Sequence, residues 1–259
     1  MAPAAGAGLT PALTARALEA LPDVGAGDDL AALVAGAAPS DLGDGDVVVI
    51  AHKVVSKAEG RVRALADIEP GERALALAAE HGKDARLVQA VLDESAELLR
   101  ARDGVFICVT HHGFVCANAG VDQSNASRPG EVVLLPLDPD DSARRLRAGI
   151  GSLRGVRPAV VVADSFGRPW RLGQTDVAIG AAGLVALDDW GGRPDAYGRE
   201  LRVTAIAIAD AAAAAADLAR GKDSRRPAVL VRGLERHVTA EDGPGAAVLR
   251  RDPAKDLFR

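Results

Sequence analysis

The chain has 259 residues, a formal net charge of −5 at pH 7 and only 3% aromatic residues. A chain of this length buries roughly 75% of the surface of its unfolded state, so a hydrophobic core alone can stabilise it. The acidic balance, the lack of a long basic block and the scarcity of aromatic side chains argue against a nucleic-acid-binding protein.

Targeting and membrane signals are also missing from the sequence. The first residues lack the basic start and apolar centre of a secretory signal, and no run of about 18 apolar residues predicts a membrane span. The two cysteines are too few for a disulfide framework. We therefore expect a cytoplasmic protein without a membrane partner, built over 1–259 as one domain or as two closely packed subdomains.

The first clear element is a strand. The apolar run VVVIA (47–51) follows an Asp-Gly-Asp turn signal and predicts a buried strand, which we expect to continue to residue 62. On such a strand Lys53, Val55 and Lys57 share one face, because strand side chains alternate.

Helices and strands then mix without a repeat of fixed period. The Ala-, Leu- and Glu-rich stretch 72–101 predicts one long helix or two. A helix is predicted to begin after Asp138, and another to end near Gly221. Strands are predicted at 104–109, 114–119, 131–137, 158–164, 201–209 and 228–233. This mixture predicts an α+β fold, with mixed β-sheets and flanking helices.

Both cysteines flank a tight His-His-Gly turn in CVTHHGFVC (108–116). In a hairpin with a three-residue loop, Cys108 and Cys116 lie opposite each other. A zinc site is one interpretation, but structural zinc sites take closely spaced ligand pairs, and no second cysteine pair exists. We favour two buried cysteines that pack as small hydrophobic side chains.

Two segments place oxygen-bearing side chains at the ends of predicted strands. One contains Asp122 and Asn125, and the other contains Asp164 followed by Ser165. Because Mg²⁺ prefers oxygen ligands and often takes only one or two carboxylates, Asp122 and Asp164 are candidates for a shared metal ion. The same residue types also form turns and surface ion pairs, so the residues alone leave both interpretations open.

No standard nucleotide-binding motif is present. The stretch GRPWRLGQT (167–175) has five residues between its glycines and Gln in place of Lys, so it is not a Walker A loop. No G-x-G-x-x-G follows a strand, which excludes a Rossmann fingerprint. Among the five lysines, Lys57 and Lys222 are the better candidates for phosphate contacts, although each is equally explained as a solvated charge.

Four longer motifs together resemble the coenzyme F-420 gamma-glutamyl ligase family. They are HKVVSKAEGRV (52–62), GFVCANAGVDQSN (113–125), ADSFGRPWRLGQTDVAIGAAGL (163–184) and DAYGRELRVTAIAIAD (195–210), in the family's order. The resemblance implies a homodimeric enzyme that uses GTP and divalent cations to join L-glutamate to the deazaflavin coenzyme F-420-0, with further gamma-linked glutamates added later. Some relatives carry a following nitroreductase-like domain, which we do not expect in a chain that ends at Arg259.

The resemblance also implies roles for individual residues. It places Asp122 and Asp164 on a first metal ion, Mg²⁺ or Mn²⁺, and Ser165, in place of the family's threonine, on a second. It places Lys57 against the phosphates as a stabilising cation. The nucleotide-binding positions that it implies are Leu21, Pro22, Asp23, Val24, His52, Lys57, Asn125, Gly221 and Lys222.

The reaction that the resemblance implies explains these residue types. A carboxylate does not react with an amine until it is activated, so GTP first phosphorylates the lactyl carboxylate of F-420-0, and the glutamate amine then attacks the acyl phosphate. Cations neutralise the phosphate charge during this transfer. No His or Glu is identified as a base. Two alternatives stay open: another metal-dependent nucleotide phosphohydrolase on this scaffold, and a non-catalytic nucleotide- or F-420-binding protein.

Overall fold

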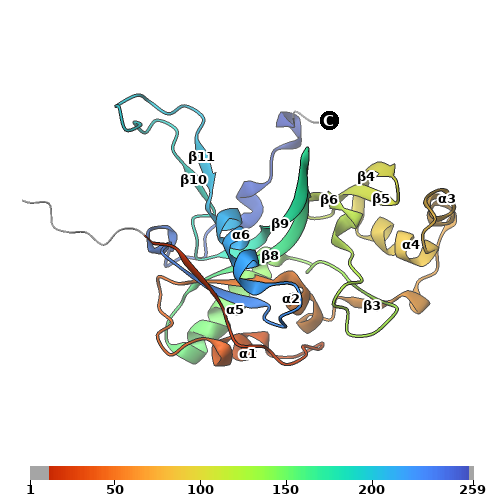
Figure 1. The fold of residues 1–259 in the computed structure, drawn as a ribbon, viewed down its shortest axis with the longest axis horizontal. Coiled ribbons are helices and arrows are strands. Elements are labelled where there is room, and N and C mark those ends of the chain that lie inside the picture. Colours follow the sequence, from red (N-terminus) through yellow and green to blue (C-terminus); the bar gives the residue numbers. More distant parts are fainter. Residues whose placement is uncertain (1–11, 257–259) are drawn as a thin grey trace, which may run out of the picture.

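A mixed five-stranded sheet forms the centre of the computed structural model, which describes residues 12–256 (Figure 1). In spatial order its strands are β1 (Thr14–Ala17), β12 (Ala228–Arg232), β2 (Val47–Ala51), β8 (Ala159–Arg168) and β9 (Arg171–Ala182). β2 and β8 pair in parallel, whereas the other pairings are antiparallel. The mixed sheet and its flanking helices confirm the predicted α+β class.

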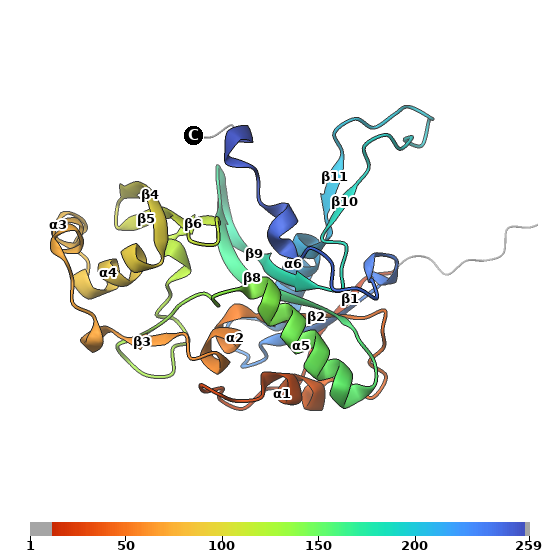
Figure 2. The same cartoon turned by 180° about the vertical axis from the view of Figure 1, so that it is seen from behind.

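Helices cover both faces of this sheet (Figure 2). They are α1 (Leu30–Ala37) and α5 (Pro139–Arg154) on one face and α6 (Ile208–Arg220) on the other. Along β2, Val48 and Ile50 pack with α1 and α5, whereas Val47 and Val49 pack with α6. Successive strand side chains point to opposite faces, so a strand covered on both sides is apolar throughout.

A second group of elements lies beside the central sheet and encloses its own apolar cluster, which includes Phe106 and Cys108 (Figure 2). Its three-stranded sheet contains β4 (Ser95–Arg102), β5 (Val105–Thr110) and β6 (Val115–Ala117). Its helices are α3 (Glu72–His81) and α4 (Ala85–Asp93), and β3 (Val62–Ala64) pairs nearby with β7 (Glu131–Val133).

Two hairpins project from this body (Figure 1). One is the far end of β8 and β9, where Trp170 and Leu172 are 81% and 97% exposed. The other begins with the antiparallel pair β10 (Leu187–Asp189) and β11 (Ala205–Ala207), and its exposed side chains include Tyr197 and Val203. Short 3₁₀ helices complete the described chain at Leu65–Asp67, Asn118–Gly120, Glu235–His237, Ala246–Leu249 and Pro253–Lys255. No helix within residues 12–256 has the length and apolar character that crossing a membrane requires.

The prediction of one continuous strand over 47–62 was wrong. β2 ends at Ala51, and the chain turns at once into α2 (His52–Ala58). The buried residues of α2 are His52, Val55 and Ser56, which follow the i, i+3, i+4 spacing of a helix face. Lys53 and Lys57 therefore lie one helical turn apart, and Val55 does not share their face.

Four further boundaries differ from the predictions. The strand predicted at 131–137 ends at Val133, because only residues 131–133 pair with β3. The helical stretch 72–101 ends at Asp93, because residues 95–102 pair with β5 as a strand, and this pairing outweighs their helix propensity. The predicted strand at 201–209 is confined to Ala205–Ala207, because α6 begins at Ile208. β8 continues beyond Asp164 to Arg168, because it pairs with β9 along that length.

Other predictions are confirmed. α5 follows Asp138, whose side chain accepts a hydrogen bond from the Asp141 N–H. α6 ends at Arg220, next to Gly221, which caps the helix and has a positive φ of 68°. In the β5–β6 hairpin, Cys108 pairs directly with Cys116, as the three-residue loop predicts.

Candidate active site

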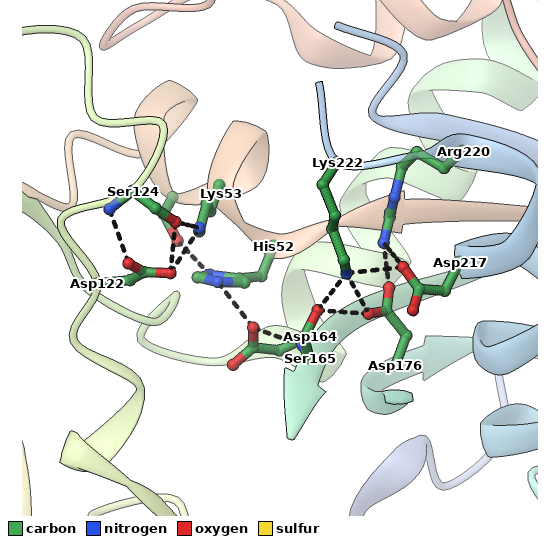
Figure 3. Close-up of polar contacts among 11 residues, drawn as sticks. His52, Lys53, Asp122, Ser124, Asp164, Ser165, Asp176, Asp217, Arg220 and Lys222 are labelled. Atoms are coloured by element: carbon green, nitrogen blue, oxygen red, sulfur yellow. Dashed lines mark hydrogen bonds and ion pairs between the residues drawn. The ribbon is translucent and has the colours of Figure 1, made fainter. Parts of the chain in front are cut away.

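The first turn of α2 connects the two carboxylates that the sequence singled out (Figure 3). Nε2 of His52 lies 3.1 Å from Oδ1 of Asp164, in a close polar contact that lacks good hydrogen-bond alignment. Nζ of Lys53 lies 2.6 Å from Oδ2 of Asp122. Because His52 and Lys53 are consecutive, one turn of helix holds both predicted metal ligands, one on each side.

Asp122 is held by a local turn as well as by Lys53. Its Oδ1 accepts a hydrogen bond from the backbone N–H of Ser124 at 2.7 Å, and its Oδ2 accepts one from the Ser124 hydroxyl at 2.9 Å. Burial acts to raise the pKa of Asp122, but the bonds from Lys53 and Ser124 outweigh it, and the net pKa lies below the ordinary value. The carboxylate is therefore ionised at neutral pH.

Asp164 and Ser165 lie within β8, not at its exit as predicted, and the Ser165 hydroxyl takes part in a buried ion-pair network (Figure 3). The Ser165 hydroxyl donates to Oδ1 of Asp176 at 2.6 Å. Asp176, on β9, is fully buried and pairs with Arg220 from the last turn of α6. The Lys222 ammonium donates to the Ser165 hydroxyl and to Asp217, each at 2.7 Å.

This network brings together two of the predicted site residues, Ser165 and Lys222. It also contains Asp176 and Arg220, to which the sequence analysis gave no role. Asp176 lies within the family-like motif 163–184 but has no signal of its own there, and Arg220 carries no signal beyond a basic residue at a helix end. The pairing of Asp176 with Arg220 joins β9 to α6 across 44 positions of sequence, and no local pattern predicts it.

The remaining nucleotide candidates are distributed over three loops and one helix. Leu21 and Val24 are buried in the core, which leaves Pro22 and Asp23 exposed between them. The pKa of Lys57 lies below its ordinary value, mainly because the side chain is partly buried. The charge of Asp23 acts to raise this pKa and the charge of Lys53 acts to lower it, so both residues lie within electrostatic reach of Lys57. Asn125 is exposed in the turn after Ser124 and has a positive φ of 56°.

The donor chemistry of Asp122, Asp164 and Ser165 suits a hard cation, since all three offer oxygen. In residues 12–256 no group of three or more His, Cys, Asp or Glu side chains is arranged to hold a metal. Mg²⁺ does not need such a group, because waters and substrate phosphates complete its shell. The residues present therefore fit a substrate-assisted Mg²⁺ or Mn²⁺ site better than a closed zinc site.

The geometry defines a site where charged side chains from α2, β8 and two loops converge, as expected of an enzyme that handles anionic substrates. The family model for F420-0:Gamma-glutamyl ligase matches residues 20–233. The chain belongs to this family of acid–amino-acid ligases, which confirms the family and the enzyme class that the motifs indicated.

Curated relatives match along most of the chain. A protein of Methanopyrus kandleri is 47% identical over 90% of this chain and 92% of its own length. One from Methanothermobacter thermautotrophicus is 44% identical over 93% and 97%. One from Archaeoglobus fulgidus is 48% identical over 84% and 86%. Each is named Coenzyme F420:L-glutamate ligase.

Proposed function

We propose that this protein adds L-glutamate to coenzyme F-420-0, first one residue and then further gamma-linked ones, with GTP as the source of activation. The observation that carries the proposal is the arrangement around α2, in which consecutive residues hold Asp122 and Asp164, within a member of the F-420 ligase family. Two carboxylates held by a neighbouring histidine and lysine suit the binding of a metal-complexed nucleotide.

Divalent cations, Mg²⁺ or Mn²⁺, belong to this proposal. Asp122 and Asp164 would hold a first ion, and Ser165 would help to hold a second. Such ions neutralise phosphate charge and orient the phosphoryl group that is transferred. The Lys222 ammonium, 2.7 Å from the Ser165 hydroxyl, supports a nucleotide phosphate close to the same point.

The chain's own cations have a defined task in this reaction. Lys57 is half-buried one helical turn after Lys53, and together they form a fixed positive surface beside Asp122. Fixed cations stabilise charge that moves during phosphoryl transfer without having to reorganise. We assign the binding and orientation of GTP to Lys53 and Lys57, together with the segments 21–24 and 221–222.

The proposed chemistry balances in two steps. A lactyl carboxylate oxygen bonds to the γ-phosphorus of GTP, and GDP leaves. The glutamate nitrogen then bonds to the acyl carbon, the bond from carbon to the phosphate oxygen breaks, and inorganic phosphate leaves. The ammonium group of glutamate loses two protons to solvent in this step, one before the attack and one after it, and keeps the third as the amide N–H. Holding the reactants in line supplies much of the rate in such reactions.

The homodimer also belongs to the proposal. The two projecting hairpins expose Trp170, Leu172, Tyr197 and Val203, although a monomer of this size normally buries most large apolar side chains. We infer that a second copy covers them. Light scattering after size exclusion checks this: Leu172→Asp should shift the dimer towards monomer, whereas an unchanged dimer mass for this variant, with its wild-type fold intact, contradicts it.

We infer a cytoplasmic location as well. Cys108 and Cys116 lie opposite each other in paired strands yet are not linked, which suits a reducing compartment.

Mass spectrometry tests the whole proposal. The purified chain is incubated with F-420-0, L-glutamate, MgCl₂ or MnCl₂ and either GTP or ATP. Product heavier by one or more glutamyl residues, with GDP released only when glutamate and F-420-0 are both present, supports the ligase. GDP release without either acceptor indicates a phosphohydrolase, and nucleotide binding without turnover indicates a binding protein.

A further inference from the structure

A small pocket adjoins Asp122. Its volume is about 160 Å³, far below the roughly 300–1,000 Å³ of pockets that take drug-sized ligands. Four of its residues form an apolar part, and the other four are polar. The lining residues are Leu87, Val91, Phe106 and Val121, with Lys83, Asn118, Asp122 and Gln123.

Three of the polar residues carry hydrogen-bond donors that the described protein leaves unused. Within residues 12–256, the Lys83 ammonium makes no ion pair or hydrogen bond. The side-chain amide of Gln123 makes no hydrogen bond to these residues either. The Asn118 carbonyl accepts a hydrogen bond from the Phe106 N–H at 3.2 Å, which fixes its amide orientation and leaves the NH₂ group free. Free donors around a small pocket are suited to carboxylate oxygens.

An unusual backbone places these groups. Asn118, Ala119 and Gly120 are consecutive residues with positive φ of 51°, 52° and 73°, and two of them are not glycine. At Gly120 a Cβ would approach Leu135 Cγ to 2.7 Å, so no side chain fits. Non-glycine residues in this conformation persist only where the surrounding structure holds them, often beside a binding site. The segment sets Asn118 on the pocket wall and leads directly to Asp122.

We propose that this pocket binds the amino-acid substrate, L-glutamate. This inference rests on the proposed function. The donors of Lys83, Asn118 and Gln123 receive the carboxylates, the apolar part contacts the methylene groups, and the amino group lies at the end of the pocket nearest Asp122. Because Asp122 belongs to both the pocket and the candidate active site, the amine is held beside the position where the acyl phosphate forms.

The pocket's size and charge favour this ligand over the nucleotide. A nucleoside triphosphate does not fit in 160 Å³, and the free cation of the pocket is a single lysine. An acidic amino acid has carboxylates at both ends of a short aliphatic chain and one ammonium group. The lining of the pocket offers donors for the carboxylates and apolar side chains for the methylene groups.

Equilibrium dialysis with radiolabelled L-glutamate and steady-state kinetics test the inference on the full chain. Lys83→Met keeps the aliphatic stem and should weaken glutamate binding and raise the KM for glutamate at least tenfold, with the KM for GTP changed less than twofold. Lys83→Arg should recover part of the loss. Lys255→Met, which changes an exposed lysine outside the pocket, is the matched control and should behave as wild type.

A second variant guards against misfolding. Asn118→Asp keeps an oxygen to accept from the Phe106 N–H but replaces the free donor by an acceptor, so it should abolish glutamate binding while thermal unfolding stays cooperative. Wild-type glutamate binding in both Lys83→Met and Asn118→Asp overturns the inference, as does a rise confined to the KM for GTP.

The outcomes also separate this inference from the proposed function. If wild type forms glutamylated product but Lys83→Met keeps its KM for glutamate, only the pocket assignment fails. If wild type forms no product yet binds glutamate through Lys83, the pocket assignment holds and the ligase proposal fails. If wild type neither binds glutamate nor forms product, both fail.

Discussion

The Lys53 ammonium lies 2.6 Å from Oδ2 of Asp122 and equally close to the hydroxyl of Ser124, while Ser124 itself donates to Asp122. A helix residue and a loop residue thus form a closed polar triangle around one carboxylate. His52, the preceding residue, contacts Asp164 on the other side. The position of α2 therefore determines where both carboxylates lie.

The triangle predicts a particular dependence of stability on pH. The folded pKa of Asp122 lies below its ordinary value of 3.8, so the carboxylate contributes stability above that value and loses it as pH falls through the folded pKa. In Lys53→Met the main bond that lowers this pKa is gone. Urea unfolding at neutral pH and below pH 3.8 should therefore show a smaller acid-induced loss in Lys53→Met than in wild type. Equal losses in the two proteins would show that Lys53 does not stabilise the ionised form.

Asp164→Asn tests the metal assignment. The change preserves size and removes the charge that attracts a cation, so ligation should fall by orders of magnitude while the unfolding temperature stays near that of wild type. Assays of glutamylated product at several Mn²⁺ concentrations measure this. Near-normal turnover of the variant in saturating Mn²⁺ would argue against direct ligation by Asp164. The matched control is Asp67→Asn, an exposed carboxylate in the 3₁₀ helix Leu65–Asp67, which should leave turnover unchanged.

The ion pair of Asp176 with Arg220 is buried, and we expect it to be costly to break on one side only. Arg220→Met leaves Asp176, with no exposed side-chain surface, without its closest partner. Removal of one member of a buried pair costs about 3–5 kcal/mol. The double variant Arg220→Met with Asp176→Leu should lose less than Arg220→Met alone, as urea denaturation can show. As a surface control, Arg102→Ala removes an exposed pair with Asp103 and should have little effect.

Much of the central sheet could be predicted because its strands are apolar runs bounded by turns. VVVIA and AVLVR appear as β2 and β12 with little change, since burial on both faces leaves a clear signal. The segment after Ala51 could not be predicted in this way. HKVVSKA alternates like a strand over a few residues, and only its contacts with β2 and β8 make the His52, Val55 and Ser56 face the buried one.

The candidate site could likewise be predicted only in part. Asp122 and Asp164 stand out in sequence because they follow apolar runs, and the motifs around them are long. Their link through His52 and Lys53 depends on α2, which the strand prediction excluded. The Lys83 pocket was not predictable either, because it combines α4, the β5 strand and the loop before Asp122 around side chains that look like ordinary surface residues.

The cysteine pair gives a further prediction. Burial raises the pKa of Cys108, and burial raises that of Cys116 to about 12, so neither thiol is ionised near neutral pH. Only the thiolate reacts readily, so a thiol reagent such as DTNB at pH 8 should leave both cysteines unmodified in the folded protein and modify both in urea. Replacement of both by Ala should retain activity at a modest cost in stability. Stoichiometric zinc in wild type that is lost in this double variant would contradict a packing role.

Lys57 allows the order of the chemistry to be tested. Lys57→Met keeps the stem of the side chain and removes a cation that we place beside the nucleotide phosphates, one helical turn from Lys53. Such a cation should stabilise the charge that moves during phosphoryl transfer more than it stabilises bound GTP. We therefore expect a large fall in kcat, a smaller rise in the KM for GTP and little change in the KM for glutamate, which reacts only after the acyl phosphate has formed.

The pH profile gives the second measurement on Lys57. Burial lowers its pKa below the ordinary 10.5, so the wild-type rate should begin to fall at a lower alkaline pH than an exposed lysine would produce. The free energy of unfolding should change with pH in the opposite direction from the rate. Lys57 binds its proton more tightly in the unfolded chain than in the folded protein, so its contribution to stability rises as pH passes the lowered pKa and levels off above 10.5. Lys57→Met should lack both effects.

A lysine that merely extends its stem along the surface would leave kcat and both KM values within about threefold of wild type, well under 1 kcal/mol. A rise confined to the KM for glutamate would place Lys57 with Lys83 in the amino-acid pocket instead.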